Sequence, residues 1–179
     1  IHLPSNAKIM HLDQQLYIPK ELTLLEAIYF PGILEQLSAN EISSLKNFVI
    51  FLFKELEIDS FVNDPTLSEG LIANLDTQKF KLSGGQMQKI SIIQAILNNP
   101  DIVIMDENFA RLDNRSVEII QKAIRIYLEK ATFLIVDHKA HGHNYNGFYD
   151  TEVHFEHSTI EVSKIAVTPS TIGIENNND

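Results

Sequence analysis

Cysteine is absent from the 179 residues, and basic side chains are scarce. Without cysteine the chain can form no disulfide framework and carry out no thiol chemistry, and it suits a reducing cytosol. Only 14 Lys and Arg stand against 24 Asp and Glu, so the formal net charge is −10. This excess of negative charge repels phosphate backbones and anionic lipid headgroups, so we expect no nucleic-acid partner.

Long apolar runs and a phosphate-binding loop are missing as well. The longest wholly apolar run, FVIFLF at 48–53, is far shorter than the ~20 residues that a membrane-spanning helix needs. The motif Gly-x-x-x-x-Gly-Lys-Ser/Thr does not occur. Gly142 and Gly147 have its glycine spacing, but Phe148 stands where lysine is required, and we reject the match. Because the first residue is Ile rather than Met, we expect the chain to be part of a longer translation product.

Hydrophobic residues make up 44% of the chain, and their pattern divides it into four segments. Residues 1–19 include a short strand around Ile9, Met10 and Leu12. Residues 20–81 have a helical period and form a helical insertion, with one apolar stripe made of Leu45, Phe48, Val49, Leu52 and Leu56. Residues 82–163 alternate helix and strand and close with a polar-faced hairpin in TEVHFEHSTIEV. Residues 164–179 form a polar tail.

An α/β fold with a parallel sheet is predicted by residues 101–138. DIVIMDE and TFLIVDH are apolar runs typical of strands buried on both faces, and a helical pattern lies between them. Strand, helix and strand of this kind form a parallel crossover unit. Ligands of such sheets bind beyond the carboxyl ends of the strands. Asp106 and Glu107 end one strand, and Asp137 and His138 end the next, so polar side chains converge there.

The stretch LSGGQMQKI at 82–90 predicts the start of a helix that suits an anion. Ser83 and Gln86 have the spacing of a capping box, and Asn98, Asn99 and Pro100 end the helix. Gly84 and Gly85 allow the backbone to approach a ligand closely, while the helix start offers N–H groups and the positive end of a dipole. A terminal phosphate would fit this site. An ordinary capped helix with a glycine turn explains the same residues equally well.

Several polar residues could complete a nucleotide site. Asp106 can hold Mg²⁺ and Glu107 can orient an attacking water, although two solvated carboxylates would look the same in the sequence. His138 can contact a transferring phosphate, and Gln14 can ligate Mg²⁺ or the water; either residue could instead be an ordinary surface group. His138, His141 and His143 suggest a metal cluster. Their spacing matches no recognised zinc motif, and we expect no zinc site.

Five blocks in order resemble the nucleotide-binding domain of ABC transporters over residues 1–163. They are Gln14, LSGGQMQKI, IVIMDE, LDNRS and IVDHK. The resemblance implies a P-loop NTPase (RecA-like) core with a helical subdomain, and ATP and Mg²⁺ as cofactors. It assigns Gln14 to the Q-loop, residues 83–86 to the signature, Asp106 to Walker B, Glu107 to the catalytic glutamate, Asp113 to the D-loop and His138 to the switch histidine. The Walker A loop and the N-terminal strands are then expected to precede this chain, which alone would be inactive.

The opening segment narrows the resemblance to the subfamily of peroxisomal fatty-acyl transporters and their bacterial relatives. The matching residues are Leu12, Gln14, Tyr17, Pro19, Thr23, Leu24 and Pro31. This implies a transmembrane domain on the same full-length chain and a homodimer, in which each signature acts on ATP held by the partner's Walker A loop. The expected place is the cytoplasmic face of a membrane, the bacterial inner membrane. A non-transport ABC ATPase and a non-catalytic interaction module are the alternative functions.

Overall fold

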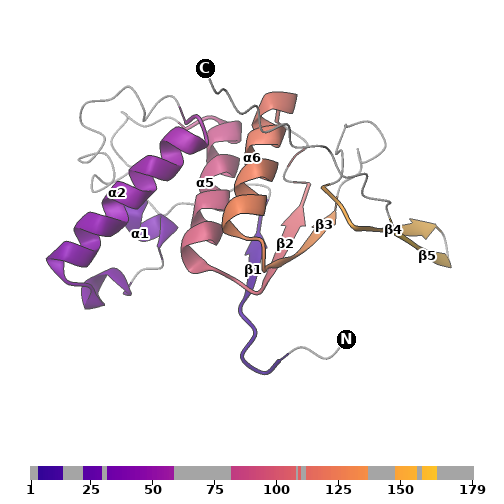
Figure 1. The fold of residues 1–179 in the computed structure, drawn as a ribbon, viewed down its shortest axis with the longest axis horizontal. Helices are drawn as coiled ribbons and strands as arrows, with labels where there is room; N and C mark the ends of the chain where they lie inside the picture. The colour runs from indigo at the N-terminus through magenta and orange to yellow at the C-terminus, as the bar shows by residue number, and fades with distance from the viewer. Residues whose placement is uncertain are drawn as a thin grey trace, which may run out of the picture. The chain divides into compact units, whose positions relative to one another are not determined.

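The computed structural model describes residues 4–13, 22–29, 32–58, 82–107, 109, 112–136, 148–156 and 159–164 (Figure 1). The chain divides into two compact units, residues 1–138 and residues 139–179. The first unit carries the parallel sheet and the helices, and the second carries a hairpin. Each unit is described by itself. Among the described residues, no helix has the length and apolar character needed to cross a bilayer.

Three parallel strands form the sheet of the first unit in the order β1-β2-β3. They are β1 (Ile9–Leu12), β2 (Ile102–Asp106) and β3 (Thr132–Val136). Ile9 pairs with Ile102 and Ile102 with Thr132, so all three strands run in register. Asp101 ties the start of the sheet together, because its carboxylate accepts a 2.7 Å hydrogen bond from the Lys8 N–H. The predicted α/β class and parallel sheet are thus confirmed.

Helices α5 (Gly84–Asn98) and α6 (Asn114–Tyr127) pack against each other and precede β2 and β3, respectively. The helical region before them contains α1 (Leu24–Ile28), the 3₁₀ turn η1 (Leu34–Gln36) and α2 (Ala39–Glu55). Both α1 and α2 contact α5. Figure 1 shows α2, α5 and α6 side by side. These helices lie within the range 20–81 for which a helical insertion is predicted. The bounds of that segment stay a prediction, and the predicted loop at 63–65 lies outside the described residues.

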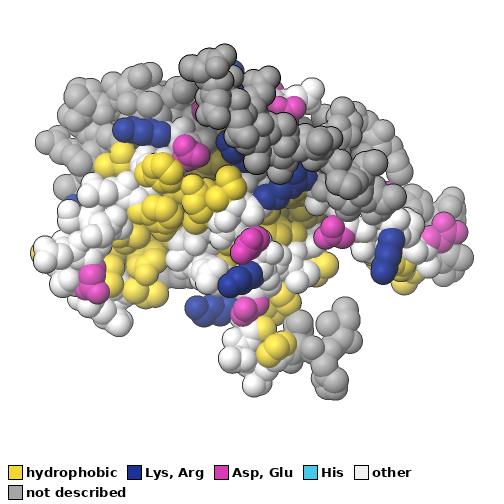
Figure 2. Space-filling model, viewed as in Figure 1, with side chains coloured by type: hydrophobic (Ala, Val, Ile, Leu, Met, Phe, Trp, Pro, Cys, Tyr) yellow, Lys and Arg dark blue, Asp and Glu magenta, His cyan; other side chains and the backbone are white. Residues whose placement is uncertain are grey.

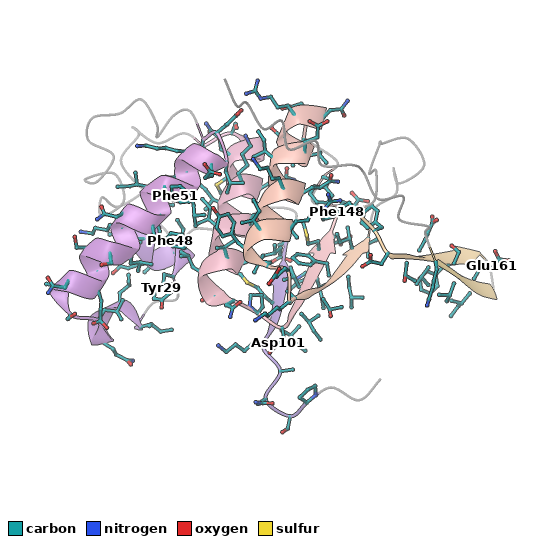
Figure 3. The ribbon with its side chains drawn as sticks, in the orientation of Figure 1. Tyr29, Phe48, Phe51, Asp101, Phe148 and Glu161 are labelled. Atoms are coloured by element: carbon teal, nitrogen blue, oxygen red, sulfur yellow. The ribbon has the colours of Figure 1, made fainter. Side chains whose placement is uncertain are left out.

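The buried core combines residues from the helices and the strands. The largest fully buried side chains include Phe53, Leu52 and Leu56 at the end of α2, and Ile90 and Ile92 in α5. The predicted stripe of α2 is partly wrong, since Phe48 is exposed and Phe53 takes a core position. Phe48 stacks on Phe51 with ring centroids 6.3 Å apart, and both belong to the apolar surface over α2 (Figures 2 and 3).

The prediction that both apolar strands are buried on both faces is wrong for β3. Leu134 is 55% exposed and Val136 is 50% exposed, while on β2 only Val103 and Met105 are fully buried. Strand residues alternate between the two faces of a sheet. One face of these strands is the better packed, while the other is half-buried at Ile102 and Ile104 of β2 and exposed on β3. An apolar run reports strand formation without showing which neighbours cover each face.

The second unit contains an antiparallel hairpin made of β4 (Thr151–Glu156) and β5 (Thr159–Lys164). This confirms the predicted hairpin. Its two pairs Val153–Val162 and Phe155–Ile160 alternate along the strands and lie on one face, and all four side chains are exposed. One face is therefore apolar. The polar tail at 164–179 lies outside the described residues beyond Lys164.

Candidate functional site

The signature turn (residues 83–86) begins α5 with a complete capping box. The Ser83 side chain accepts a 3.2 Å hydrogen bond from the Gln86 N–H, and the Gln86 side chain accepts a 2.8 Å bond from the Ser83 N–H. The Ser83 carbonyl accepts from Met87 at 3.0 Å. The N–H groups of a first helical turn have no partner within the helix. Those of Gly84 and Gly85 therefore have no partner within α5 and lie at the positive end of the helix dipole.

The two signature glycines have different surroundings. A Cβ on Gly84 would have no heavy atom within 4 Å, whereas one on Gly85 would lie 3.3 Å from Cδ2 of Leu112. Gly85 thus allows α5 to approach the loop that precedes α6. That contact brings the signature turn and the predicted D-loop residue Asp113 to the same region of the first unit.

Asp113 is the N-cap of α6. Its two carboxylate oxygens accept hydrogen bonds from the Ser116 N–H at 2.8 Å and from the Ser116 hydroxyl at 3.1 Å. These bonds, the backbone one first, hold the pKa of Asp113 below its ordinary value of 3.8, and the Lys89 charge adds to the effect. Asp113 is therefore ionised at neutral pH. Its predicted contact with a nucleotide stays a prediction, because its observed partners lie within α6.

Asp106 and Glu107 lie at the carboxyl end of β2. Asp106 is the last strand residue and is paired with Val136, the last residue of β3. The Glu107 N–H donates a 2.8 Å hydrogen bond to the Val136 carbonyl, which holds Glu107 beside the point where β3 ends. Glu107 has φ of 51°, a left-handed conformation that costs a non-glycine residue energy. Such conformations gather at functional sites.

Not every predicted site residue falls within the described structure. Ser83, Gly84, Gly85, Gln86, Asp106, Glu107 and Asp113 do, and they occupy two places: the capped starts of α5 and α6, and the end of β2. Gln14 and His138 lie outside the described residues. The connection between the two places includes Phe109, which is buried and whose carbonyl accepts from the Leu112 N–H at 3.1 Å.

Sequence reasoning missed Lys89 and Glu57. Lys89 is only 8% exposed, and its ammonium donates a 3.3 Å hydrogen bond to the Glu57 carbonyl. No local pattern indicates this pairing, because the two residues are separated by 32 positions. A lysine among the apolar residues of the signature helix is the only available signal.

The described residues supply part of the donor set that a magnesium nucleotide needs. Among them, no three acidic or histidine side chains gather into a metal cluster. Mg²⁺ bound with a nucleotide keeps several waters and needs only one or two carboxylates in addition to the phosphate oxygens. Asp106, which is exposed at the strand end, is one such carboxylate. The α5 start provides N–H groups for an anion, so the donor chemistry of both places suits a phosphate and its cation.

Comparison with known proteins identifies the family. The sequence profile of the family described as "ABC transporter" matches residues 4–110, which is more than half of the chain. The chain is 37% identical over 91 residues to the ATP-dependent lipid A-core flippase of Francisella novicida, covering 51% of this chain and 15% of that protein. It is 42% identical over 74 residues to the sophorolipid transporter of Starmerella bombicola, covering 41% of this chain and 6% of that protein.

A plant relative is similar over a segment of comparable length. ABC transporter B family member 13 of Arabidopsis thaliana is 36% identical over 91 residues, covering 51% of this chain and 7% of that protein. The matched segment thus spans only a small part, at most 15%, of these three relatives. The profile covers β1, the helical insertion, the signature turn and the acidic end of β2. This chain therefore belongs to the ABC transporter family.

Proposed function

We propose that this chain is the ATP-hydrolysing portion of an ABC transporter and powers the movement of a substrate across a membrane. The observation that carries the proposal is the position of Glu107: it follows Asp106 at the carboxyl end of β2, in a strained left-handed conformation. A carboxylate there can accept the proton of an attacking water, as a general base does.

The remaining residues take supporting roles in this proposal. Asp106 would hold Mg²⁺ together with Gln14, and the metal would neutralise phosphate charge. The signature turn and Asp113 would meet the terminal phosphate at the start of α5, where N–H groups favour negative charge. His138 would contact the same phosphate. Preorganised groups of this kind stabilise charge that develops during phosphoryl transfer.

The proposal extends to partners, place and cargo. A second copy of the nucleotide-binding domain and a transmembrane domain on the same full-length chain would be required, at the cytoplasmic face of a membrane, with the bacterial inner membrane as the expected place. The opening segment favours the subfamily of fatty-acyl transporters. Two relatives are named for lipid A-core and for sophorolipid, and both names support an amphipathic lipid as cargo.

The test is Glu107→Gln in the full-length protein, which keeps the size of the side chain and removes its basicity. Steady-state Mg-ATPase should fall by about 10²–10⁴-fold, the range typical of losing a general base, while ATP binding is retained. Glu118→Gln is the matched control, since Glu118 is an exposed glutamate on α6 and should leave turnover unchanged. If Glu107→Gln lowers the ATPase rate by less than about tenfold, well under that range, Glu107 is not the base.

A further inference from the structure

Helix α2 ends in a motif that normally contains glycine. The Glu57 N–H donates to the Lys54 carbonyl at 3.1 Å, and the Ile58 N–H donates to the Phe53 carbonyl at 3.0 Å. These are the two hydrogen bonds of a Schellman motif, in which the residue after the C-cap is left-handed and is usually glycine. Here that residue is Glu57, with φ of 49°. Phe53 and Ile58, which flank the turn, are both fully buried.

A glutamate at this position gives up the conformational ease of glycine and gains a side-chain contact, in addition to the carbonyl contact that any residue here could make. Its carboxylate accepts a 2.7 Å hydrogen bond from Nη2 of Arg115, forming an ion pair. Its carbonyl accepts the 3.3 Å bond from the Lys89 ammonium. Arg115 belongs to the first turn of α6 and Lys89 to the second turn of α5. The end of one helix is therefore tied to the beginnings of two others, which lie beside it in Figure 1.

Both partners of Glu57 lie next to candidate nucleotide-contacting residues. Lys89 follows the signature turn by three residues on the same helix, and Arg115 follows the N-cap Asp113 by two. The close approach of Gly85 to Leu112 is a second contact between the start of α5 and the residues just before α6. Lys89 is largely buried, so the direction of its ammonium depends on the Glu57 carbonyl. Losing the Glu57 side chain would remove the ion pair that joins the end of α2 to the start of α6, while the Glu57 carbonyl that holds Lys89 would remain.

We propose that Glu57 is a positioning residue, whose ion pair with Arg115 and bond to Lys89 hold the starts of α5 and α6 in the relative placement that ATP hydrolysis requires. This inference rests on the proposed function, because it assigns the two helix starts to the nucleotide. It assigns a role in hydrolysis to a residue of the helical insertion, which would act without contacting the nucleotide or the reacting water.

Glu57→Gly in the full-length protein separates positioning from stability. Glycine adopts the left-handed conformation without steric cost, so the Tm should stay unchanged or rise. The kcat for Mg-ATP should fall by about three- to tenfold, less than the ~100-fold that a 1 Å displacement can cause. The KM for ATP should stay within about twofold, since no ATP contact is removed. Asn99→Gly is the matched control: Asn99 is the left-handed C-cap of α5, with φ of 43°, and its change should leave kcat unchanged.

A charge swap tests whether the ion pair is the cause. Glu57→Arg and Arg115→Glu should each lower kcat, because each places like charges together. The double variant should recover at least about half of the parent rate, since it restores opposite charges at the same separation. Hydrogen exchange of residues 82–90 and 112–118 gives a readout independent of turnover. It should be faster in Glu57→Gly and unchanged in Asn99→Gly.

The outcomes distinguish the two proposals. A parent protein without Mg-ATPase activity contradicts the proposed function, while the exchange measurement still decides the role of Glu57. Parental kcat and parental exchange in Glu57→Gly overturn the positioning role. So does a loss of kcat that accompanies a lowered Tm, because Glu57 would then contribute only stability. A double variant no better than the worse single variant also overturns it.

Discussion

The two signature glycines show how one methyl group could separate stability from function. Gly84→Ala should stabilise the chain by about 0.5–1 kcal/mol, because alanine loses less conformational entropy on folding and has open space at this position. Gly85→Ala should give a smaller gain, since its methyl group would lie 3.3 Å from Leu112 and the leucine must shift. Urea unfolding midpoints of the three proteins check the order.

The Gly84→Ala variant also tests whether a nucleotide closely approaches the backbone at this residue. In the full-length protein, Gly84→Ala should lower the ATPase rate even though it stabilises the fold, because the new methyl group would occupy the space that the proposed site leaves for the phosphate. An unchanged ATPase rate in Gly84→Ala would mean that no ligand comes close to this residue.

Single residues also mark the limit of what the sequence predicts. Ser83 and Gln86 could be assigned to a capping box because their interaction spans three positions. Glu57 could not be assigned a role, because its ion-pair partner Arg115 is 58 positions away. The left-handed backbone of Glu107 was likewise invisible, since nothing in the letters IVIMDE indicates its φ.

Carboxylates at the starts of three helices make the stability of these helices depend on pH. Glu26 accepts from the Thr23 N–H and hydroxyl at 2.7 Å, and Glu41 accepts from the Ser38 hydroxyl at 2.6 Å. These hydrogen bonds hold the pKa of each glutamate below its ordinary value of 4.5. Asp113 behaves similarly at the start of α6, with a pKa below its ordinary 3.8.

The sign of the effect follows from these lowered pKa values. A carboxyl group with a lower pKa in the folded state contributes stability above its unfolded pKa, and loses it as the pH falls through the folded value. The chain should therefore unfold at lower urea concentration as the pH falls from about 6 to about 3. The double variant Glu26→Gln with Glu41→Gln should show a flatter dependence, because glutamine can still form a capping box but does not titrate. Equal slopes would contradict this account.

Element boundaries were predictable where the signals were local. The start of α5 at a capping box and its end before Pro100 follow from neighbouring residues, as does the strand at 9–12. The exposure of Leu134 and Phe48 did not follow from their apolar character, because it depends on which elements are packed alongside. The sequence thus indicates which segments form strands and helices more reliably than which of their faces are covered.

At the scale of the whole molecule, the chain carries a signature turn and an acidic strand end but no Gly-x-x-x-x-Gly-Lys-Ser/Thr motif. The proposed function therefore requires a phosphate-binding loop from outside these 179 residues. In the proposed homodimer, the signature turn of one subunit faces ATP bound to the phosphate loop of the other. Because the two elements of one site would come from different subunits, two proteins with different defects could complement each other. A site within one chain would not allow this.

Ser83→Arg in the full-length protein tests that arrangement. The arginine should fill the gap before the α5 N–H groups and prevent closure of the dimer on ATP, while ATP binding to monomers hardly changes. The substitution also removes the Ser83 cap, at a cost of about 0.5–2 kcal/mol. Ser38→Arg is the matched control, because it removes the equivalent capping box at the start of α2 and should lower stability similarly without stopping turnover.

Mixing two inactive proteins gives the decisive result. In heterodimers of Ser83→Arg with a variant that lacks the phosphate-loop lysine, one composite site has both defects and the other has neither. Because the intact site again combines a lysine with a signature turn whose N–H groups favour negative charge, ATPase activity should return in the mixture and remain absent from either protein alone. If Ser83→Arg instead weakens ATP binding to monomers as much as loss of the lysine does, the signature turn acts on nucleotide held by its own chain, and the proposed arrangement across the dimer is wrong.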